Sequence, residues 1–331
     1  MTIVGRRVDG WWAFERRVAW TVASGAVLLL WFGSAPVGAA DSDPFAMFES
    51  PVSNPVQFED PRATTEVRPL YVYHKLDGGF AKELGAKSGD AHIAALQLRV
   101  ALTDRLALIA TKDGYVWLRP AGANTNGWAN LGLGAKYTFY RDPESLTLAT
   151  VGLRYEIPSG SRDVFQGQFG NKGNGVFNPF LSAGWGIENL AGIGDFHLLG
   201  YTGARIPVSS GDSTFFDLSL HADWGLMIGP DSLGPIYPLV ELNWVQTLDG
   251  GSRLPIDKEG FDFFNLGSSG AGGKGVVTMA VGARYPLCRD LGEVLGRTVG
   301  VDIGAAWEAP LTDRGDIFGW RVTTDVIFSL R

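Results

Sequence analysis

The residues best suited to chemistry lie in the alternating run from Phe216 to Trp224. His221 stands between Asp217 and Asp223, and Ser219 belongs to the same row. Same-face neighbours on a strand are about 7 Å apart, whereas a nucleophilic serine needs its base within hydrogen-bond distance. This spacing predicts a histidine that is hydrogen-bonded to a neighbouring acid, and it predicts no catalytic residues.

Other catalytic and cofactor motifs do not stand out in the sequence. It has no Gly-x-Ser-x-Gly elbow, no metal-type histidine spacing and no phosphate-binding glycine loop. Cys288 is the only cysteine, which excludes an intramolecular disulfide framework and a multi-cysteine metal site. A net charge of −7 gives no basic footprint for nucleic acid. We therefore expect no enzyme activity, no metal, no cofactor and no nucleic-acid partner.

The elements that position these residues alternate with a period of two. In Leu131–Phe139 and Val151–Ile157, apolar residues alternate with Gly, Lys, Thr, Arg and Glu. The alternating runs reach 10–13 residues, whereas strands of globular proteins usually have about 5–6. Glycine is also abundant, at 45 of 331 residues, and only 19% of residues are charged. Long strands with one apolar and one small or polar face are typical of outer-membrane barrels, which close because lipid tolerates no open sheet edge.

The fold class predicted is all-β: a transmembrane antiparallel β-barrel with about 12 strands and up-and-down topology. Short turns and longer connections alternate along the chain, and an even strand number places both termini on the periplasmic side. A barrel of 10 strands and a barrel of 14 strands are the alternatives. The candidate strands are residues 67–76, 90–102, 105–118, 128–140, 145–158, 175–188, 195–207, 213–227, 236–248, 275–287, 299–310 and 317–330.

The N-terminus predicts export. Residues 1–40 have basic residues, an apolar run over about residues 18–32 and then small residues, which is typical of a cleaved signal peptide. We expect cleavage near Ala40 and localisation in the cell outer membrane. Residues 41–65 contain four prolines and predict a Pro-rich periplasmic N-terminal arm that acts as a linker. Three phenylalanines in this arm could pack against another part of the protein. Residues 66–331 form the barrel.

The polar face of the strands predicts the residues that line the lumen. One interpretation is a polar conduit whose charges set selectivity. The other is a lumen filled by ion pairs, since 12 strands lie between filled small barrels and open porins. Expected pairs are Arg154 or Lys136 with Glu156, and Arg321 with Asp302 or Asp325. The lumen-lining candidates are Gln97, Arg99, Lys136, Arg154, Glu156, Asp217, His221, Asp223, Glu241, Asn243, Arg284, Asp302, Glu308, Arg321 and Asp325.

Two long connections are rich in glycine, and each has two interpretations. Residues 159–174 and 249–274 could fold inward as constrictions, or they could point outward as binding tips. Outward tips would suit a structural or surface-binding barrel.

Three segments carry a family resemblance: Ala101–Leu108, Leu131–Tyr137 and Val151–Gly160. They resemble the outer-membrane family associated with the meta-pathway of phenol degradation, in which an apolar strand ends in a Pro-Ser/Thr-Gly corner before a long loop. The resemblance is best over residues 95–190. It implies an outer-membrane barrel that aids the passage of small, often apolar or aromatic, compounds, and it supplies no catalytic residues. The chain departs from a usual barrel ending, because its last residue is Arg331 and not an aromatic.

The function predicted is therefore a passive channel or transporter for small solutes, with a structural or surface-binding barrel with a filled lumen as the alternative. An outer-membrane lipid hydrolase is the least favoured class. The partners expected are outer-membrane lipid, the barrel-assembly machinery and an unidentified small-molecule solute.

Overall fold

The computed structural model describes residues 43–83, 88–120, 124–161, 164, 174–228, 234–294 and 296–330. Within these residues, two short helices, η1 (Pro44–Met47) and α2 (Gly78–Glu83), accompany a fold that is otherwise all-β. In this part of the chain, no helix is long and apolar enough to cross a membrane. The strands are β1 (Thr65–Leu76), β2 (Gly89–Ala101), β3 (Leu106–Lys112), β4 (Tyr115–Pro120), β5 (Thr125–Trp128), β6 (Leu131–Asp142), β7 (Thr147–Ile157), β8 (Val176–Leu190), β9 (Gly194–Pro207), β10 (Thr214–Trp224), β11 (Leu226–Met227), β12 (Pro235–Asp249), β13 (Gly275–Cys288), β14 (Glu293–Val294), β15 (Arg297–Pro310) and β16 (Phe318–Leu330).

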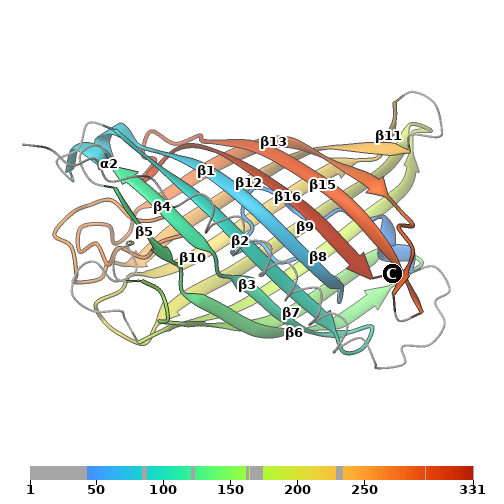
Figure 1. Cartoon of the computed structure of the whole chain (residues 1–331), viewed down its shortest axis with the longest axis horizontal. Coiled ribbons are helices and arrows are strands. Elements are labelled where there is room, and N and C mark those ends of the chain that lie inside the picture. Colours follow the sequence, from blue (N-terminus) through green and yellow to red (C-terminus); the bar gives the residue numbers. More distant parts are fainter. Residues whose placement is uncertain are drawn as a thin grey trace, which may run out of the picture.

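The strands close into a barrel because β1 pairs with both β2 and β16 (Figure 1). The pairings between the named strands are antiparallel. β3 and β4 pair with successive parts of β2 and count as one interrupted strand. β5 and β6 likewise form one strand position, which gives 12 positions around the barrel. The predicted fold class is thus confirmed, and each strand end lies within three residues of its predicted place.

The interruption between β3 and β4 has a local cause at Gly114. Its φ is +113°, a conformation that favours glycine, and a Cβ there would lie 2.8 Å from the carbonyl oxygen of Ala94. The chain turns out of the strand direction at this point and then resumes pairing with β2.

The two ends of the barrel carry different connections. The first residue of β1, Thr65, pairs with Leu330 at the end of β16, so the strands begin and finish at the same end. Three of the connections at that end are the short residues 102–105, 143–146 and 191–193. We call this the short-turn end, and the opposite end, which carries α2 at the left of Figure 1, the long-loop end. Short turns face the periplasm in barrels of this type.

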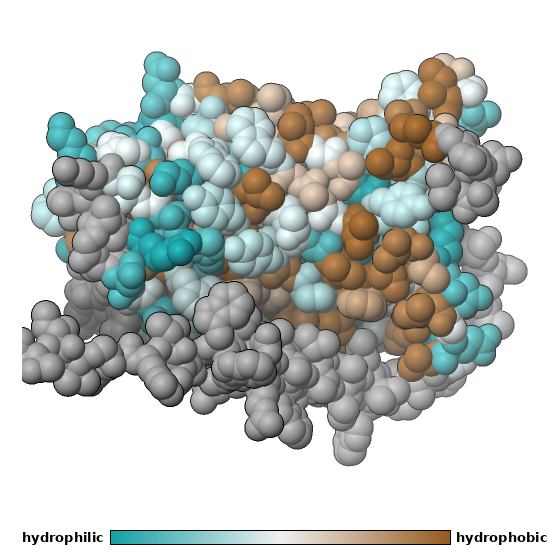
Figure 2. All heavy atoms as spheres, turned by 45° about the horizontal axis from the view of Figure 1, so that its top comes forward, coloured by the Kyte–Doolittle hydropathy of each residue, from teal (hydrophilic) through white to brown (hydrophobic). Residues whose placement is uncertain are grey.

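Alternation along each strand separates an apolar outer face from a polar inner face. On β7 and β8, for example, Val151, Leu153 and Leu181 are 43–50% exposed, whereas Arg154 and Ser182 are buried. Figure 2 shows apolar side chains grouped on the wall, with hydrophilic side chains concentrated toward the long-loop end. An apolar band around a closed barrel is the surface that lipid requires.

This outer face generates a first prediction. Val151 lies in the middle of β7 and is 43% exposed. We expect Val151→Arg to lower the free energy of unfolding in lipid vesicles by about 2–4 kcal/mol, because it places a charge near the bilayer midplane. The control is Leu102→Arg, in a short turn outside the apolar band, which should cost about 0–1 kcal/mol. Denaturant unfolding in vesicles measures both, and equal costs would contradict a lipid-facing β7.

Candidate functional site

Residues 43–64 lie inside the barrel, and we call them the inner segment. Phe45, Phe48, Ser53, Phe58 and Glu59 are each at most 1% exposed. The segment enters at the short-turn end, turns back where the amide of Phe58 donates to the carbonyl of Asn54, and leads into β1 at the same end. This differs from the periplasmic linker that its prolines suggest. The physical reason is that the barrel wall supplies hydrogen-bond partners to a segment whose backbone has little regular structure of its own.

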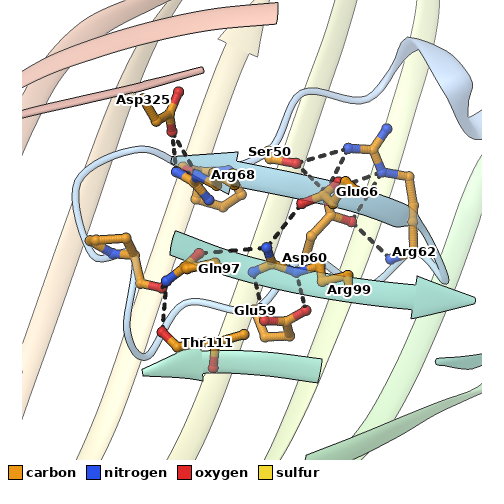
Figure 3. Close-up of polar contacts among 12 residues, drawn as sticks. Ser50, Glu59, Asp60, Arg62, Glu66, Arg68, Gln97, Arg99, Thr111 and Asp325 are labelled. Atoms are coloured by element: carbon orange, nitrogen blue, oxygen red, sulfur yellow. Dashed lines mark hydrogen bonds and ion pairs between the residues drawn. The ribbon is translucent and has the colours of Figure 1, made fainter. Parts of the chain in front are cut away.

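The wall binds this segment largely through its backbone. Arg68 Nη2 donates to the carbonyl of Pro51 at 2.6 Å, and Gln97 Nε2 donates to the carbonyl of Pro55 at 2.6 Å (Figure 3). Glu241 accepts the amides of Val52 and Ser53, both at 2.7 Å. Prolines lack an amide donor but keep their carbonyl, so an arginine-rich wall suits a Pro-rich segment.

Charges complete the attachment at Glu59. Arg99 makes a two-pronged contact with its carboxylate, Nε to Oε1 at 2.8 Å and Nη2 to Oε2 at 2.9 Å. Lys136 Nζ donates to Oε1 at 2.7 Å. Arg99 also binds Glu66 of β1 at 2.9 Å. All four side chains are at most 4% exposed, so the charges must satisfy one another.

A chain of hydrogen bonds connects β9, β10 and β12 at the position of His221. His197 Nδ1 lies 2.7 Å from Asp223 Oδ1, and Asp223 Oδ2 lies 2.8 Å from His221 Nε2. His221 Nδ1 lies 2.8 Å from Glu241 Oε1, the carboxylate that also holds the inner segment. Both ring nitrogens of His221 are thus engaged by carboxylates, as expected for a structural histidine.

Ser219 does not stand in a hydrolase arrangement. Its hydroxyl is 1% exposed, faces the lumen and accepts from Asn54 Nδ2 at 3.4 Å. Lipid lies on the other side of the wall, and His221 is committed to Asp223 and Glu241. Among the described residues, no group of three or more His, Cys, Asp or Glu could hold a metal ion.

The structure places the lumen-lining candidates on the inner face, but the pairs expected among them are wrong. Fourteen of the fifteen are at most 6% exposed, and Glu156 is partly exposed. Glu156 pairs with Lys112 at 2.7 Å, and not with Arg154 or Lys136. Arg154 instead binds the carbonyls of Val56 and Gln57 in the inner segment.

Arg321 and Asp325 also have other partners than expected. Arg321 Nε binds Glu308 Oε2 at 2.6 Å, and Arg321 Nη1 binds Asp262 Oδ2 at 2.7 Å. Asp325 pairs with Arg284 at 2.9 Å and with Arg68. Alternation identifies the face of a residue but not its neighbour across the lumen, and several partners come from segments outside the strands.

The connection from 250 to 274 folds into the long-loop end, and we call it the inward loop. Phe261 and Phe264 are at most 2% exposed, and Arg321 lies 4.9 Å from the ring centroid of Phe263. Glu259 accepts the amides of Leu266 and Ser268 at 3.0 and 2.8 Å, which fixes the loop conformation. The inward alternative therefore holds for this loop, whereas most of residues 159–174 lie outside the described residues.

The inner segment and the inward loop meet inside the barrel. Val56 packs in one hydrophobic cluster with Phe263 and Phe264. Two cavities beside this contact measure about 20 Å³ each, enough for about one water molecule. A larger cavity of about 330 Å³ lies at the short-turn end, beside Glu49 and Arg62. Among the described residues, the inner segment and the inward loop therefore fill much of the lumen at mid-depth.

Sequence reasoning missed several residues of this site. Arg205, which binds Asp217 at 2.9 Å, and His197 both lie on the inner face of β9, the strand whose alternation competes with a second apolar phase. Glu59 and Asp262 lie outside the strands, where alternation carries no signal. The run of acids and prolines before β1 was the available signal for the inner segment.

The strand order, the apolar outer face and the occupied lumen define a class: a 12-stranded β-barrel of the outer-membrane type, closed from inside. In structure the chain is similar to an outer membrane channel from Pseudomonas putida F1, with 16% identity over 82% of this chain and 98% of that chain and a TM-score of 0.47. It is also similar to the NanC porin (9% identity, 81% and 99% covered, TM-score 0.44) and to the beta domain of the Bordetella autotransporter BrkA (15%, 80% and 99%, TM-score 0.42). Likenesses this distant carry no argument about function. No family model and no curated protein matches the sequence.

A second prediction concerns the attachment of the inner segment. Glu59→Gln leaves Arg99 and Lys136 buried without their shared carboxylate, so we expect the segment's docking to weaken by about 3–5 kcal/mol. Amide hydrogen exchange of Val52 and Ser53 measures this, because both amides are bonded only while the segment is docked. The control is Asp43→Asn: Asp43 pairs with Arg141, but its side chain is 54% exposed, and such pairs contribute about 0–1 kcal/mol. Equal exchange in the two variants would show that Glu59 does not anchor the segment.

A third prediction concerns pH and the inward loop. Burial raises the pKa of Asp212 to about 6 despite Arg253 of the loop, and burial raises the pKa of Asp316 to about 6 despite Arg314. The folded loop thus favours the neutral carboxyls. Protonation of Asp212 and Asp316 therefore stabilises the folded loop. This stabilisation is fully present below the ordinary aspartate pKa near 4, and it is lost as the pH rises to about 6.

Amide exchange of Leu266 and Ser268, corrected for its intrinsic pH dependence, should therefore show stronger protection at pH 4 than at pH 7. The double variant Asp212→Asn, Asp316→Asn should lose this difference. Protection that instead increases from pH 4 to pH 7 would contradict the assignment.

Proposed function

We propose that this protein is an outer-membrane channel for small solutes, closed by its inner segment and opened when that segment leaves the lumen. One observation carries the proposal: both ends of the segment lie at the short-turn end, so it can withdraw through one opening without threading the barrel. In the described part of the chain, its backbone-to-backbone hydrogen bonds stay within the segment, such as Phe48 to Phe45 and Phe58 to Asn54.

The barrel wall is complete without the segment. β1 pairs with β2 from Glu66 to Lys75, and its two ends, Thr65 and Leu76, both pair with β16, so withdrawal breaks no strand pairing. What withdrawal breaks is a set of side-chain contacts, each contributing about 0.5–3 kcal/mol depending on charge. A solute, a partner or a change in conditions that compensates for part of the free energy of these contacts would open the lumen.

The vacated wall supports selective passage. Basic residues dominate the half from β1 to β9, among them Arg68, Arg99 and Lys136. Acidic residues dominate the half from β10 to β16, among them Asp217 and Glu241. Opposed charges across a narrow lumen filter solutes by charge and orientation. Buried aromatics beside them are compatible with the apolar or aromatic solutes that the sequence resemblance implies.

Export and assembly complete this proposal. Cleavage after Ala40 would leave Asp41 as the mature N-terminus, two residues before Asp43, which lies at the short-turn end beside Arg141. The barrel-assembly machinery would then insert the strands into outer-membrane lipid. A signal peptide over residues 1–40 stays a prediction, since those residues lie outside the described part.

A second candidate is a structural or surface-binding barrel whose lumen stays filled. It is favoured by the aromatic cluster around Phe45, Phe48 and Phe58, which adds apolar burial to the polar attachment. The two candidates differ in one property: only a channel lets its inner segment leave under native conditions.

A fourth prediction separates the two candidates with a cysteine pair. Asn243 Nδ2 of β12 lies 2.9 Å from Ser53 Oγ, so Ser53→Cys and Asn243→Cys place two thiols in contact once Cys288→Ser has removed the native one. In planar bilayers, we expect no current from the oxidised pair and channel openings after reduction, because the disulfide holds the segment in the lumen.

The control is Ser53→Cys alone, which should conduct equally under oxidising and reducing conditions. If the reduced pair, the single variant and Glu59→Gln all fail to conduct, the lumen is permanently filled and the structural candidate is correct.

A further inference from the structure

Glu59 occupies a cationic site that belongs to the barrel wall. Arg99 comes from β2 and Lys136 from β6, and their three contacts with the carboxylate measure 2.7–2.9 Å. Lys136 is 1% exposed, and its ammonium donates to Glu59 and to the carbonyl of Asp60, both in the inner segment. The wall therefore presents a carboxylate site that the segment fills.

Withdrawal of the segment leaves this site with an excess of positive charge. Arg99 would keep Glu66 at 2.9 Å, and Arg154 would keep Thr111 at 3.0 Å and Tyr201 at 2.9 Å. Lys136 would lose both partners. The site lies in the mainly basic half of the wall, so an anion that reaches the vacated lumen is attracted to it. The two-pronged arginine contact matches a planar carboxylate in particular.

The residue before Glu59 defines the other side of the vacated space. Phe58 is 1% exposed and packs in a cluster with Phe180, Leu199 and Tyr201 of the wall. Its ring centroid lies 6.1 Å from that of Tyr201. Removal of Phe58 and Glu59 together thus opens a space with a cationic side and an aromatic side.

We propose that this space is a solute subsite for small aromatic carboxylates, and that Phe58 and Glu59 occupy it as an internal stand-in. The inference rests on the proposed channel function and names its substrate class. A carboxylate solute competes with Glu59 for Arg99 and Lys136, so it favours the conformation in which the segment has left. Solute binding and opening are then the same event.

The test measures segment release directly, using benzoate as the probe and benzyl alcohol as the uncharged control. Ser53→Cys in the Cys288→Ser chain places one thiol where it is buried in the docked segment. Benzoate is added at ten times its dissociation constant for the vacated site. This should raise the ratio of chains with a released segment to chains with a docked segment about tenfold. The rate of maleimide labelling should rise by the same factor, because only a released segment exposes the thiol. Benzyl alcohol should leave the rate unchanged.

Two lysine variants assign the effect to the site. Lys136→Gln should label faster without ligand, because Glu59 has lost one partner. Its benzoate response should be smaller than that of the parent chain, because only Arg99 is left to bind the carboxylate. Lys112→Gln is the matched control: Lys112 is a partly buried lysine of the lumen that pairs with Glu156, and this variant should keep the full benzoate response. A benzoate response that is undiminished in Lys136→Gln, or an equal response to benzyl alcohol, would overturn the proposal.

Failure of the inference and failure of the proposed function are distinguishable. Labelling without benzoate, together with currents from the reduced Ser53→Cys chain, reports whether the segment leaves and the lumen conducts. If those currents occur while benzoate has no effect on labelling, the channel stands and the carboxylate subsite is wrong. If neither labelling nor current occurs in any variant, the channel proposal itself has failed.

Discussion

The rest of the structure depends on one constraint: charges inside a lipid-facing barrel must be neutralised inside it. Lipid excludes them from the outer face, and a 12-stranded lumen is wider than the eight-stranded ones that wall side chains fill. Here the inner segment and the inward loop supply the missing partners. Glu59 neutralises Arg99 and Lys136, and Asp262 neutralises Arg321. The barrel wall therefore depends on two further segments of its own chain to neutralise the charges on its inner face.

Much of the wall could be predicted from the sequence because a strand has only two faces. The alternation in Val151–Ile157 places Val151 outside and Arg154 inside whatever the neighbouring strands are, and the structure has both there. Turn length likewise follows from local sequence, so the strand ends lie within three residues of their predicted places. These are local properties, and local sequence is sufficient for them.

The contents of the lumen could not be predicted in the same way, because they depend on contacts between residues far apart in the chain. Arg154 contacts Val56, 98 residues away, and Arg321 contacts Ser53, 268 residues away. No period marks the inner segment, since it is held by arginines that bind its carbonyls. Prolines disfavour a strand or a long helix there, and that property is shared by a solvated linker and by a buried segment with as little regular structure as the short η1.

Arg321 shows why the two closures of the lumen depend on each other. Its guanidinium binds Glu308 of the wall, Asp262 of the inward loop and the carbonyl of Ser53 in the inner segment. Gln57 of the inner segment donates to the carbonyl of Asp262 at 3.5 Å, so the segment and the loop also touch directly. If the loop moves away, Arg321 loses the carboxylate of Asp262, and if the segment moves away, it loses the carbonyl of Ser53, in a site with no exposed surface. Displacement of the inner segment thus lowers the stability of the docked inward loop, and displacement of the loop lowers the stability of the docked segment. This coupling favours two states of the lumen: one in which both are docked and one in which neither is.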